Sequence, residues 1–174
     1  MRRAGASFRR HGENCMNNVL PWIIFSLNGR FFAVNSCLVS GIMKLPQITP
    51  VPEAPDIFHG ICDVRGETIP IFSMHRLLKL PENEGGEAMV VTLSRSEGEQ
   101  LPCMGFTVDN VISVDNINLI DEKQNTHCLF ISRYVFGIAR CEKINGDIIV
   151  LDENIILGVL EDFEKCQEKE ASSE

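Results

Sequence analysis

Two β-rich runs near the start of the chain flank a two-residue turn signal, and this arrangement restricts the possible folds most strongly. Residues 22–27 read WIIFSL, residues 30–34 read RFFAV, and Asn28-Gly29 lies between them. Asparagine and glycine tolerate the positive φ angles that a two-residue hairpin loop needs. The sequence therefore predicts an antiparallel hairpin here.

A second hairpin is predicted within residues 60–80, which read GICDVRGETIPIFSMHRLLKL. The first strand reaches Val64, the chain turns at Arg65-Gly66, and the second strand follows as ETIPIF. Gly66 suits a turn position that excludes a side chain. The segment thus places a guanidinium at the tip of a tight turn between two half-buried strands.

More strands are predicted along the rest of the chain. Residues 36–45 fit either a turn of helix or an irregular strand, and four prolines between 46 and 55 predict a stiff surface connector. Asn145-Gly146 predicts another two-residue hairpin loop, which leads into a strand at 147–151. The other predicted strands are 89–93, 104–108, 111–114, 128–132 and 135–141.

Two short helices complete the prediction. Ser73 is a suitable N-cap for a helix at 74–79, since its hydroxyl can accept a hydrogen bond from a backbone amide. Apolar residues recur at three- and four-residue intervals in 153–163, as one buried helical face requires. Strands at this spacing, joined by hairpins, are typical of an all-β barrel or sandwich with short helices.

Composition excludes several function classes. The chain has 174 residues, which suits one domain or two small lobes, and 44% of them are hydrophobic. The formal net charge of −8 repels phosphate backbones, so we expect no nucleic-acid partner. An oligonucleotide-binding barrel would need basic and aromatic strand faces, but this acidic chain has one Trp and one Tyr.

The ends of the chain differ from its middle. Residues 1–18 are polar and basic, and we expect them to be a disordered extension, with Met16 as a candidate start because the composition changes there. We expect one domain at 19–163 and a polar tail at 164–174. No apolar run approaches the ~18–20 residues that span a bilayer, and no apolar stretch follows the N-terminal arginines. A cytoplasmic protein without membrane insertion is expected.

Signals for catalysis or metal binding are weak. Seven cysteines, an odd number with no CxxC pair, are typical of reduced thiols that act as small apolar fillers. A Ser73–His75 pair would point in different directions on a helix, and Cys62 near His59 suits an inert strand thiol. These residues could still form a small hydrolase site. We expect no enzyme, no metal and no cofactor.

One acidic and amide-rich cluster is a weak candidate for a calcium site. An EF-hand loop that began at Asp115 would need a glycine at its sixth position and a glutamate at its twelfth, where the chain has Ile120 and Thr126. We therefore interpret these acidic and amide residues as solvated strand ends. The cluster comprises Asp109, Asp115, Asn116, Asn118 and Asp121.

Binding of another protein is the hypothesis that remains. The Arg65 guanidinium could offer five donors to a partner, or it could pair across the turn with Glu67 as a surface arginine. Val39, Ile42 and Met43 lie beside the proline-rich connector, where they could belong to the core or line a groove for a partner helix. Both alternatives stay open on these residues alone.

The chain resembles the CheW family of chemotaxis coupling proteins. The resemblance covers 22–160 and is specific because several blocks occur in order. They are WIIFSLNGRFFAVN, IMKLPQITPVPEAPDIFHGICDVRGETIPIF with the following RLLKLP, GFTVDNVISV, and GDIIVLDENIIL.

The resemblance implies two five-stranded SH3-like β-barrels that share a core, plus a C-terminal helix, and no catalytic activity. It implies an adaptor, monomeric alone, that joins cytoplasmic hairpin tips of chemoreceptors to the regulatory domain of a histidine autokinase within a membrane receptor array. An adaptor in a non-flagellar pathway, such as surface motility or adhesion, is the alternative. Kinase-contact residues are not assigned. The expected receptor-binding groove comprises Val39, Ile42, Met43, Gly60, Arg65 and Gly66.

This sequence departs from the family pattern at positions near that groove. Gly41 stands where a glutamate usually precedes the Ile42 position, and Ser73 stands where an aspartate is usual. Asp63-Val64 replaces an Asn-Leu pair before Arg65. The first departure removes a charge from the expected receptor face, so it bears on which receptors the chain binds.

Overall fold

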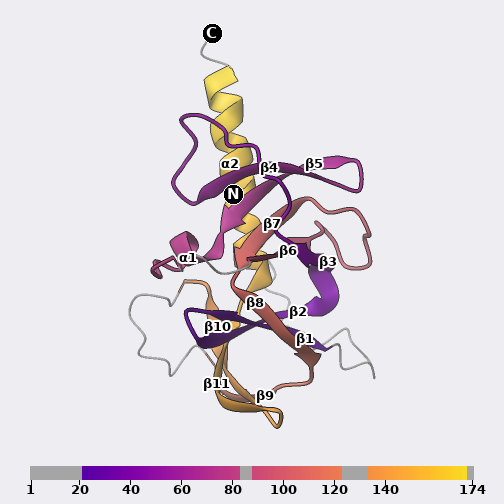
Figure 1. Cartoon of the computed structure of the whole chain (residues 1–174), viewed down its shortest axis with the longest axis vertical. Coiled ribbons are helices and arrows are strands. Elements are labelled where there is room, and N and C mark those ends of the chain that lie inside the picture. Colours follow the sequence, from indigo (N-terminus) through magenta and orange to yellow (C-terminus); the bar gives the residue numbers. More distant parts are fainter. Residues whose placement is uncertain (1–20, 83–87, 123–132, 172–174) are drawn as a thin grey trace, which may run out of the picture.

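The computed structural model describes residues 21–82, 88–122 and 133–171, which form two β-sheets and a long C-terminal helix (Figure 1). The predicted disordered extension at 1–18 and the predicted strand at 128–132 lie outside the described residues. Within the described ranges, no helix is both long enough and apolar enough to cross a membrane.

One sheet has six strands in the order β8-β1-β2-β11-β10-β9. Its pairs are antiparallel except for β2 and β11, which run parallel. The strands are β1 (Trp22–Leu27), β2 (Arg30–Asn35), β8 (Asn110–Asp115), β9 (Asn118–Glu122), β10 (Val135–Cys141) and β11 (Ile144–Leu151).

The other sheet has five strands in the order β3-β6-β7-β5-β4, with β5 and β7 parallel. Its strands are β3 (Val39–Lys44), β4 (Phe58–Val64), β5 (Glu67–Ser73), β6 (Met89–Leu93) and β7 (Met104–Val108). The chain builds β1 and β2, then this whole sheet, and then returns to the first sheet. The helices are η1 (Ser36–Leu38), α1 (Met74–Leu77) and α2 (Glu153–Ala171).

Two of the three predicted two-residue hairpins are confirmed. Leu27 pairs with Arg30 across Asn28-Gly29, whose φ angles are 50° and 72°. Val64 pairs with Glu67 in the same way across a turn in which both residues again have positive φ. The segment 36–45, for which two structures were possible, forms one turn of 3-10 helix followed by strand β3.

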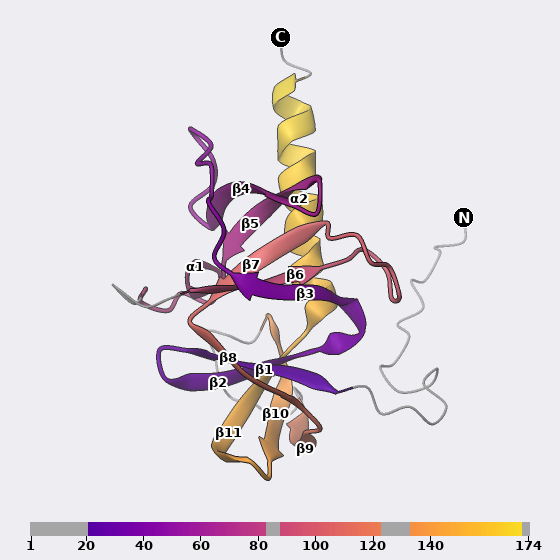
Figure 2. The ribbon, with the colours of Figure 1, turned by 45° about the vertical axis from the view of Figure 1, so that its right-hand side comes forward.

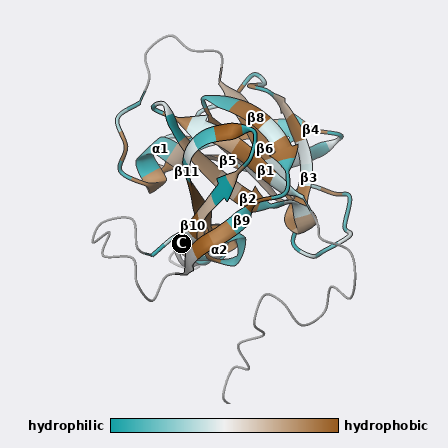
Figure 3. Cartoon of the chain, turned by 90° about the horizontal axis from the view of Figure 1, so that it is seen from below, coloured by the Kyte–Doolittle hydropathy of each residue, from teal (hydrophilic) through white to brown (hydrophobic). Residues whose placement is uncertain are grey.

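Side chains alternate along the strands between two kinds of core. On β1, Ile23 and Phe25 enter a large core shared by the two sheets, whereas Ile24 packs with Ala33 and Ile148 in a smaller cluster. The five-stranded sheet has its own small cluster, formed by Cys62, Val64, Ile69, Ile71 and Val90. Hydrophobic stretches accordingly follow the strands of both sheets, and hydrophilic residues mark the connecting loops (Figure 3).

This arrangement confirms the expected all-β class with two barrel-like halves and a shared core. The second half has the expected five strands, and the first has six within the described residues, because β9 adds to β10 at the sheet edge. The sequence analysis did not predict β9, since Asn118 and Asp121 made this segment look like a polar strand end.

Helix α2 extends further than predicted. We expected it to end at Phe163, but it continues to Ala171, so most of the polar tail predicted at 164–174 is helical. No glycine or proline follows Phe163 to stop the helix. The helix runs from the shared core along the five-stranded sheet, where Phe163 stacks on Phe58 with ring centroids 4.6 Å apart (Figure 1).

The predicted hairpin loop at Asn145-Gly146 is wrong. Cys141 pairs with Ile144, so the turn is Glu142-Lys143, three residues earlier, and Asn145-Gly146 lies within β11, where Gly146 has φ 145°. Cys141 and Ile144 both pack in the small core of the six-stranded sheet. Their burial sets the register in place of the local turn preference.

Candidate partner-binding surface

The β4–β5 turn holds Arg65 in an uncommon backbone conformation. Arg65 has φ 56°, which costs a non-glycine residue about 1 kcal/mol or more. The Asp63 carboxylate accepts a hydrogen bond from the Gly66 amide at 3.1 Å, which stabilises the turn. The Arg65 side chain is exposed at the tip, and Gly66 beside it is exposed as well.

Barrel closure brings Arg65 next to β3, although β3 and β4 are opposite edges of the sheet. Thr49 and Ile61 exchange two backbone hydrogen bonds of 2.8 and 2.9 Å, which join the chain after β3 to β4. A Cβ atom placed on Gly41 of β3 would lie 3.7 Å from Nη2 of Arg65. The two edges therefore meet, and the guanidinium lies beside Gly41.

Gly60 contributes to this closure and is not on the outer surface. It is buried with φ 146°, and a Cβ there would lie 2.4 Å from both Cγ2 of Ile48 and the Thr49 carbonyl oxygen. The missing side chain lets the Thr49 backbone approach β4 closely. Gly60 thus supports the surface around Arg65 from inside.

Strand β3 places its apolar residues on two different faces. Ile42 pairs with Val91 of the shared core and remains 36% exposed at the rim of that core. Val39, half-buried, packs on the shared core as well. Met43 pairs with Val90 and packs inside the barrel, so the structure does not bring Met43 to the surface of Ile42.

Two residues of β8, which the sequence analysis did not single out, are also apolar and exposed. Val114 pairs with Ile23 of the shared core, so its side chain points toward the five-stranded sheet, yet 51% of it is exposed. Ile112 is 42% exposed. Strand β8 forms one edge of its sheet, beside β1 (Figure 2). We define the β3–β8 surface as Val39, Ile42, Arg65, Gly66, Ile112 and Val114.

A sequence signal for the β8 residues exists. The run Val111-Ile112-Ser113-Val114 places apolar residues on both faces of one strand. One face must then be buried by something other than its own sheet, either by the rest of the chain or by a partner. The sequence alone does not show which face stays open.

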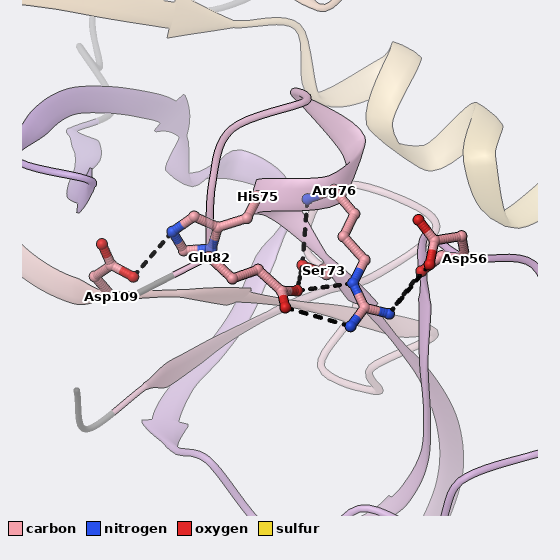
Figure 4. Close-up of polar contacts among 6 residues, drawn as sticks. All are labelled: Asp56, Ser73, His75, Arg76, Glu82 and Asp109. Carbon is pink, nitrogen blue, oxygen red and sulfur yellow. Dashed lines mark hydrogen bonds and ion pairs between the residues drawn. The ribbon is translucent and has the colours of Figure 1, made fainter. Parts of the chain in front are cut away.

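The residues considered for a Ser–His pair have other partners (Figure 4). Ser73 Oγ accepts from the Arg76 amide at 3.3 Å and lies 3.3 Å from the Glu82 carboxylate. His75 Nε2 faces Asp109 Oδ1 at 3.0 Å. The hydrogen bond from Arg76 lowers the pKa of the Glu82 carboxyl. Ser73 is a helix cap here, as predicted.

The other chemical candidates are also engaged elsewhere. Cys62 packs inside the five-stranded barrel, and burial raises the pKa of its thiol. Asp115 of the acidic and amide-rich cluster pairs with Lys143 at 2.6 Å, which lowers the pKa of the Asp115 carboxyl. In the part of the chain that the structure describes, no three His, Cys, Asp or Glu side chains converge as metal ligands.

The Asp109 carboxylate joins three segments and should contribute to stability. It accepts from the Asn28 amide at 2.7 Å and faces the buried His75 ring. We expect Asp109→Ala to lower the free energy of unfolding by about 1–3 kcal/mol, because it leaves buried polar groups without a partner. Urea unfolding checks this, with Asp147→Ala as control, since the exposed Asp147–Arg140 pair is worth about 0–1 kcal/mol. Equal losses for both variants would contradict the assignment.

Comparisons with known proteins agree with this architecture. The family model "CheW-like domain" matches residues 21–157. The chain is 25% identical over 151 residues to chemotaxis protein CheW of Bacillus subtilis, covering 86% of this chain and 88% of the relative. It is 25% identical over 137 residues to chemotaxis protein CheW of Treponema pallidum, covering 75% and 77%.

A solved structure shows the same fold. The crystal structure of the scaffolding protein TtCheW from Thermoanaerobacter tengcongensis superposes with a TM-score of 0.64 at 21% identity, covering 76% of this chain and 88% of that one. The matched domain identifies the family, and the two sheets around one core agree with it. The chain belongs to the CheW-like domain family.

Proposed function

We propose that this protein is an adaptor that couples chemoreceptors to a histidine autokinase in bacterial chemotaxis. The observation that carries the proposal is the exposed Arg65 guanidinium, which lies beside Gly41 of β3, the strand that also carries the partly exposed Ile42, in a CheW-like domain. Such a surface suits an amphipathic helical partner, because the apolar residues supply burial and the arginine fixes orientation.

The proposed receptor partner is the cytoplasmic hairpin tip of a chemoreceptor. Val39, Ile42, Ile112 and Val114 would bury the apolar side of the tip, and Arg65 with Gly66 would meet its polar side. Gly60 and Met43 act from inside the barrel, where they keep β3 and the turn in place. This assignment retains the residues of the expected groove but gives two of them a supporting role.

The proposed second partner is the regulatory domain of the autokinase. It would bind elsewhere on the chain, so that receptor tip and kinase are held together in one array at the membrane. The adaptor itself would be a cytoplasmic monomer that reaches the membrane only through its receptors. We further propose that residues 19–163 form the complete folding unit and that 1–18 and 164–174 are not needed for it.

Arg65→Glu is expected to weaken binding of a receptor tip fragment by about a hundredfold, and Arg65→Ala by about tenfold. The substitutions remove or reverse the exposed charge at the turn without touching a buried contact. Isothermal titration with a soluble fragment that spans the hairpin tip checks this, and circular dichroism checks the fold. Arg140→Ala, which changes another exposed arginine on β10, is the matched control. Unchanged affinity of both Arg65 variants would remove Arg65 from the site.

Reconstitution tests the coupling itself. Receptor fragments, the autokinase and ATP are combined with and without the adaptor, and kinase autophosphorylation is measured. We expect the adaptor to make the autophosphorylation rate depend on receptor fragments. A rate that is the same with and without the adaptor, at concentrations where the tip binds, would contradict the proposed function.

A further inference from the structure

Among the residues that the structure describes, the Arg65 guanidinium has no counter-ion. Across the residues that the structure describes, Arg65 forms neither an ion pair nor a hydrogen bond. The Asp63 carboxylate is occupied by the Gly66 amide, and the pairing with Glu67 considered from the sequence does not form. The turn therefore presents an exposed cation whose donors are all available to a partner.

Gly41 is the residue that leaves this cation unpaired. Its φ lies outside the positive range, so the backbone does not require glycine there. A Cβ on Gly41 would point to Arg65 Nη2 at 3.7 Å and would lie 3.1 Å from Thr92 Oγ1. A side chain at position 41 would thus fit after a small shift of Thr92, and it would extend along the guanidinium. A carboxylate there would reach Arg65.

We infer that Gly41 determines partner specificity: it leaves Arg65 to bind a carboxylate that the chemoreceptor tip itself supplies. This inference rests on the proposed function and adds the chemistry of the partner. The tip lies across β3, whose only strand partner among the described residues is β6, with apolar residues on Ile42 and an Asp or Glu side chain on Arg65.

The charge of the molecule makes this contact selective. With a formal net charge of −8, the chain repels acidic partners over most of its surface. Asp63 and Glu67 flank Arg65 in sequence, and their negative charges offset its positive charge. A partner carboxylate that stays some distance from Arg65 is therefore attracted only weakly. A carboxylate that reaches the guanidinium can form a bidentate, charge-assisted pair. A tip without a correctly placed acid leaves the cation unpaired, which disfavours it.

A matched pair of substitutions tests the inference. Gly41→Glu supplies an internal carboxylate to Arg65, whereas Gly41→Gln adds the same bulk near Thr92 without charge. We expect Gly41→Glu to weaken binding of the tip fragment about tenfold more than Gly41→Gln does. In an Arg65→Gln background the two position-41 variants should bind alike, because the internal pair can no longer form.

Substitutions in the fragment complete the cycle. Each Asp or Glu of the tip is changed to its amide, and one change should weaken binding to the wild-type chain but not to Arg65→Gln. The inference would be overturned if Gly41→Glu and Gly41→Gln lost the same binding affinity, or if no carboxylate of the tip were coupled to Arg65. In either case, binding of the tip to the wild-type chain would still uphold the proposed function. A fragment that fails to bind the wild-type chain at all would instead overturn the proposed function, and the inference with it.

Discussion

Truncation of Phe25 to alanine is expected to lower the free energy of unfolding by about 3–5 kcal/mol. Phe25 is fully buried on β1, and its ring lies 6.0 Å from that of Phe32 and 5.8 Å from that of Phe106, between ring centroids. Phe106 belongs to β7 of the other sheet, so the cavity would open between the two halves. Urea unfolding measures the loss.

The same experiment tests whether the two halves unfold as one unit. Trp22, the only tryptophan, reports on the six-stranded sheet, and alkylation of the buried Cys62 reports on the interior of the other. Both probes should give the same midpoint, because the core is shared. Leu101→Ala is the control, since that side chain is 52% exposed and should cost little. Separate midpoints, or a loss for Phe25→Ala as small as for Leu101→Ala, would contradict a single shared core.

Gly60→Ala is expected to lower the free energy of unfolding by about 2–6 kcal/mol, through two effects that add. Backbone at φ 146° is unfavourable for alanine by about 1–3 kcal/mol. The new methyl group would also overlap Ile48 and the Thr49 carbonyl, and such overpacking costs about 1–3 kcal/mol. Thermal and urea unfolding check the sum.

Two other glycines separate these effects. Gly98→Ala has the backbone penalty alone, since φ is 78° and a Cβ would meet nothing within 4 Å. Gly158→Ala has neither effect and lies within α2, where alanine should stabilise by up to about 1 kcal/mol. The expected order of stability is Gly158→Ala, wild type, Gly98→Ala, Gly60→Ala. A Gly60→Ala variant as stable as Gly98→Ala would show that Thr49 does not pack closely against β4.

The comparison of the two Asn-Gly turns shows which features are local. Asn28-Gly29 forms the predicted loop because the strands on both sides place their apolar residues in cores at that register. Asn145-Gly146 has the same turn preference, but a loop there would move Cys141 and Ile144 out of their cluster. Burial in a sheet built from distant strands outweighs a dipeptide preference.

In the candidate site, too, some features follow from the local sequence and others from tertiary contacts. The hairpin sequence alone predicted that Arg65 lies at a turn tip, since the positive φ angles and the Asp63 contact are local properties. The position of Arg65 beside Gly41 depends on how the five-stranded sheet closes. The register of β3 against β6 decides that Met43 points inward while Ile42 does not.

By itself, the sequence determined the all-β class, most strand positions and the exposed arginine turn, because side-chain alternation, turn residues and helix caps act over a few residues. The tertiary structure alone decided the extra edge strand β9, the true β10–β11 turn and the meeting of β3 with Arg65. These features depend on contacts between segments far apart in the chain. Their register follows from which side chains the shared core can bury, and no local pattern carries that information.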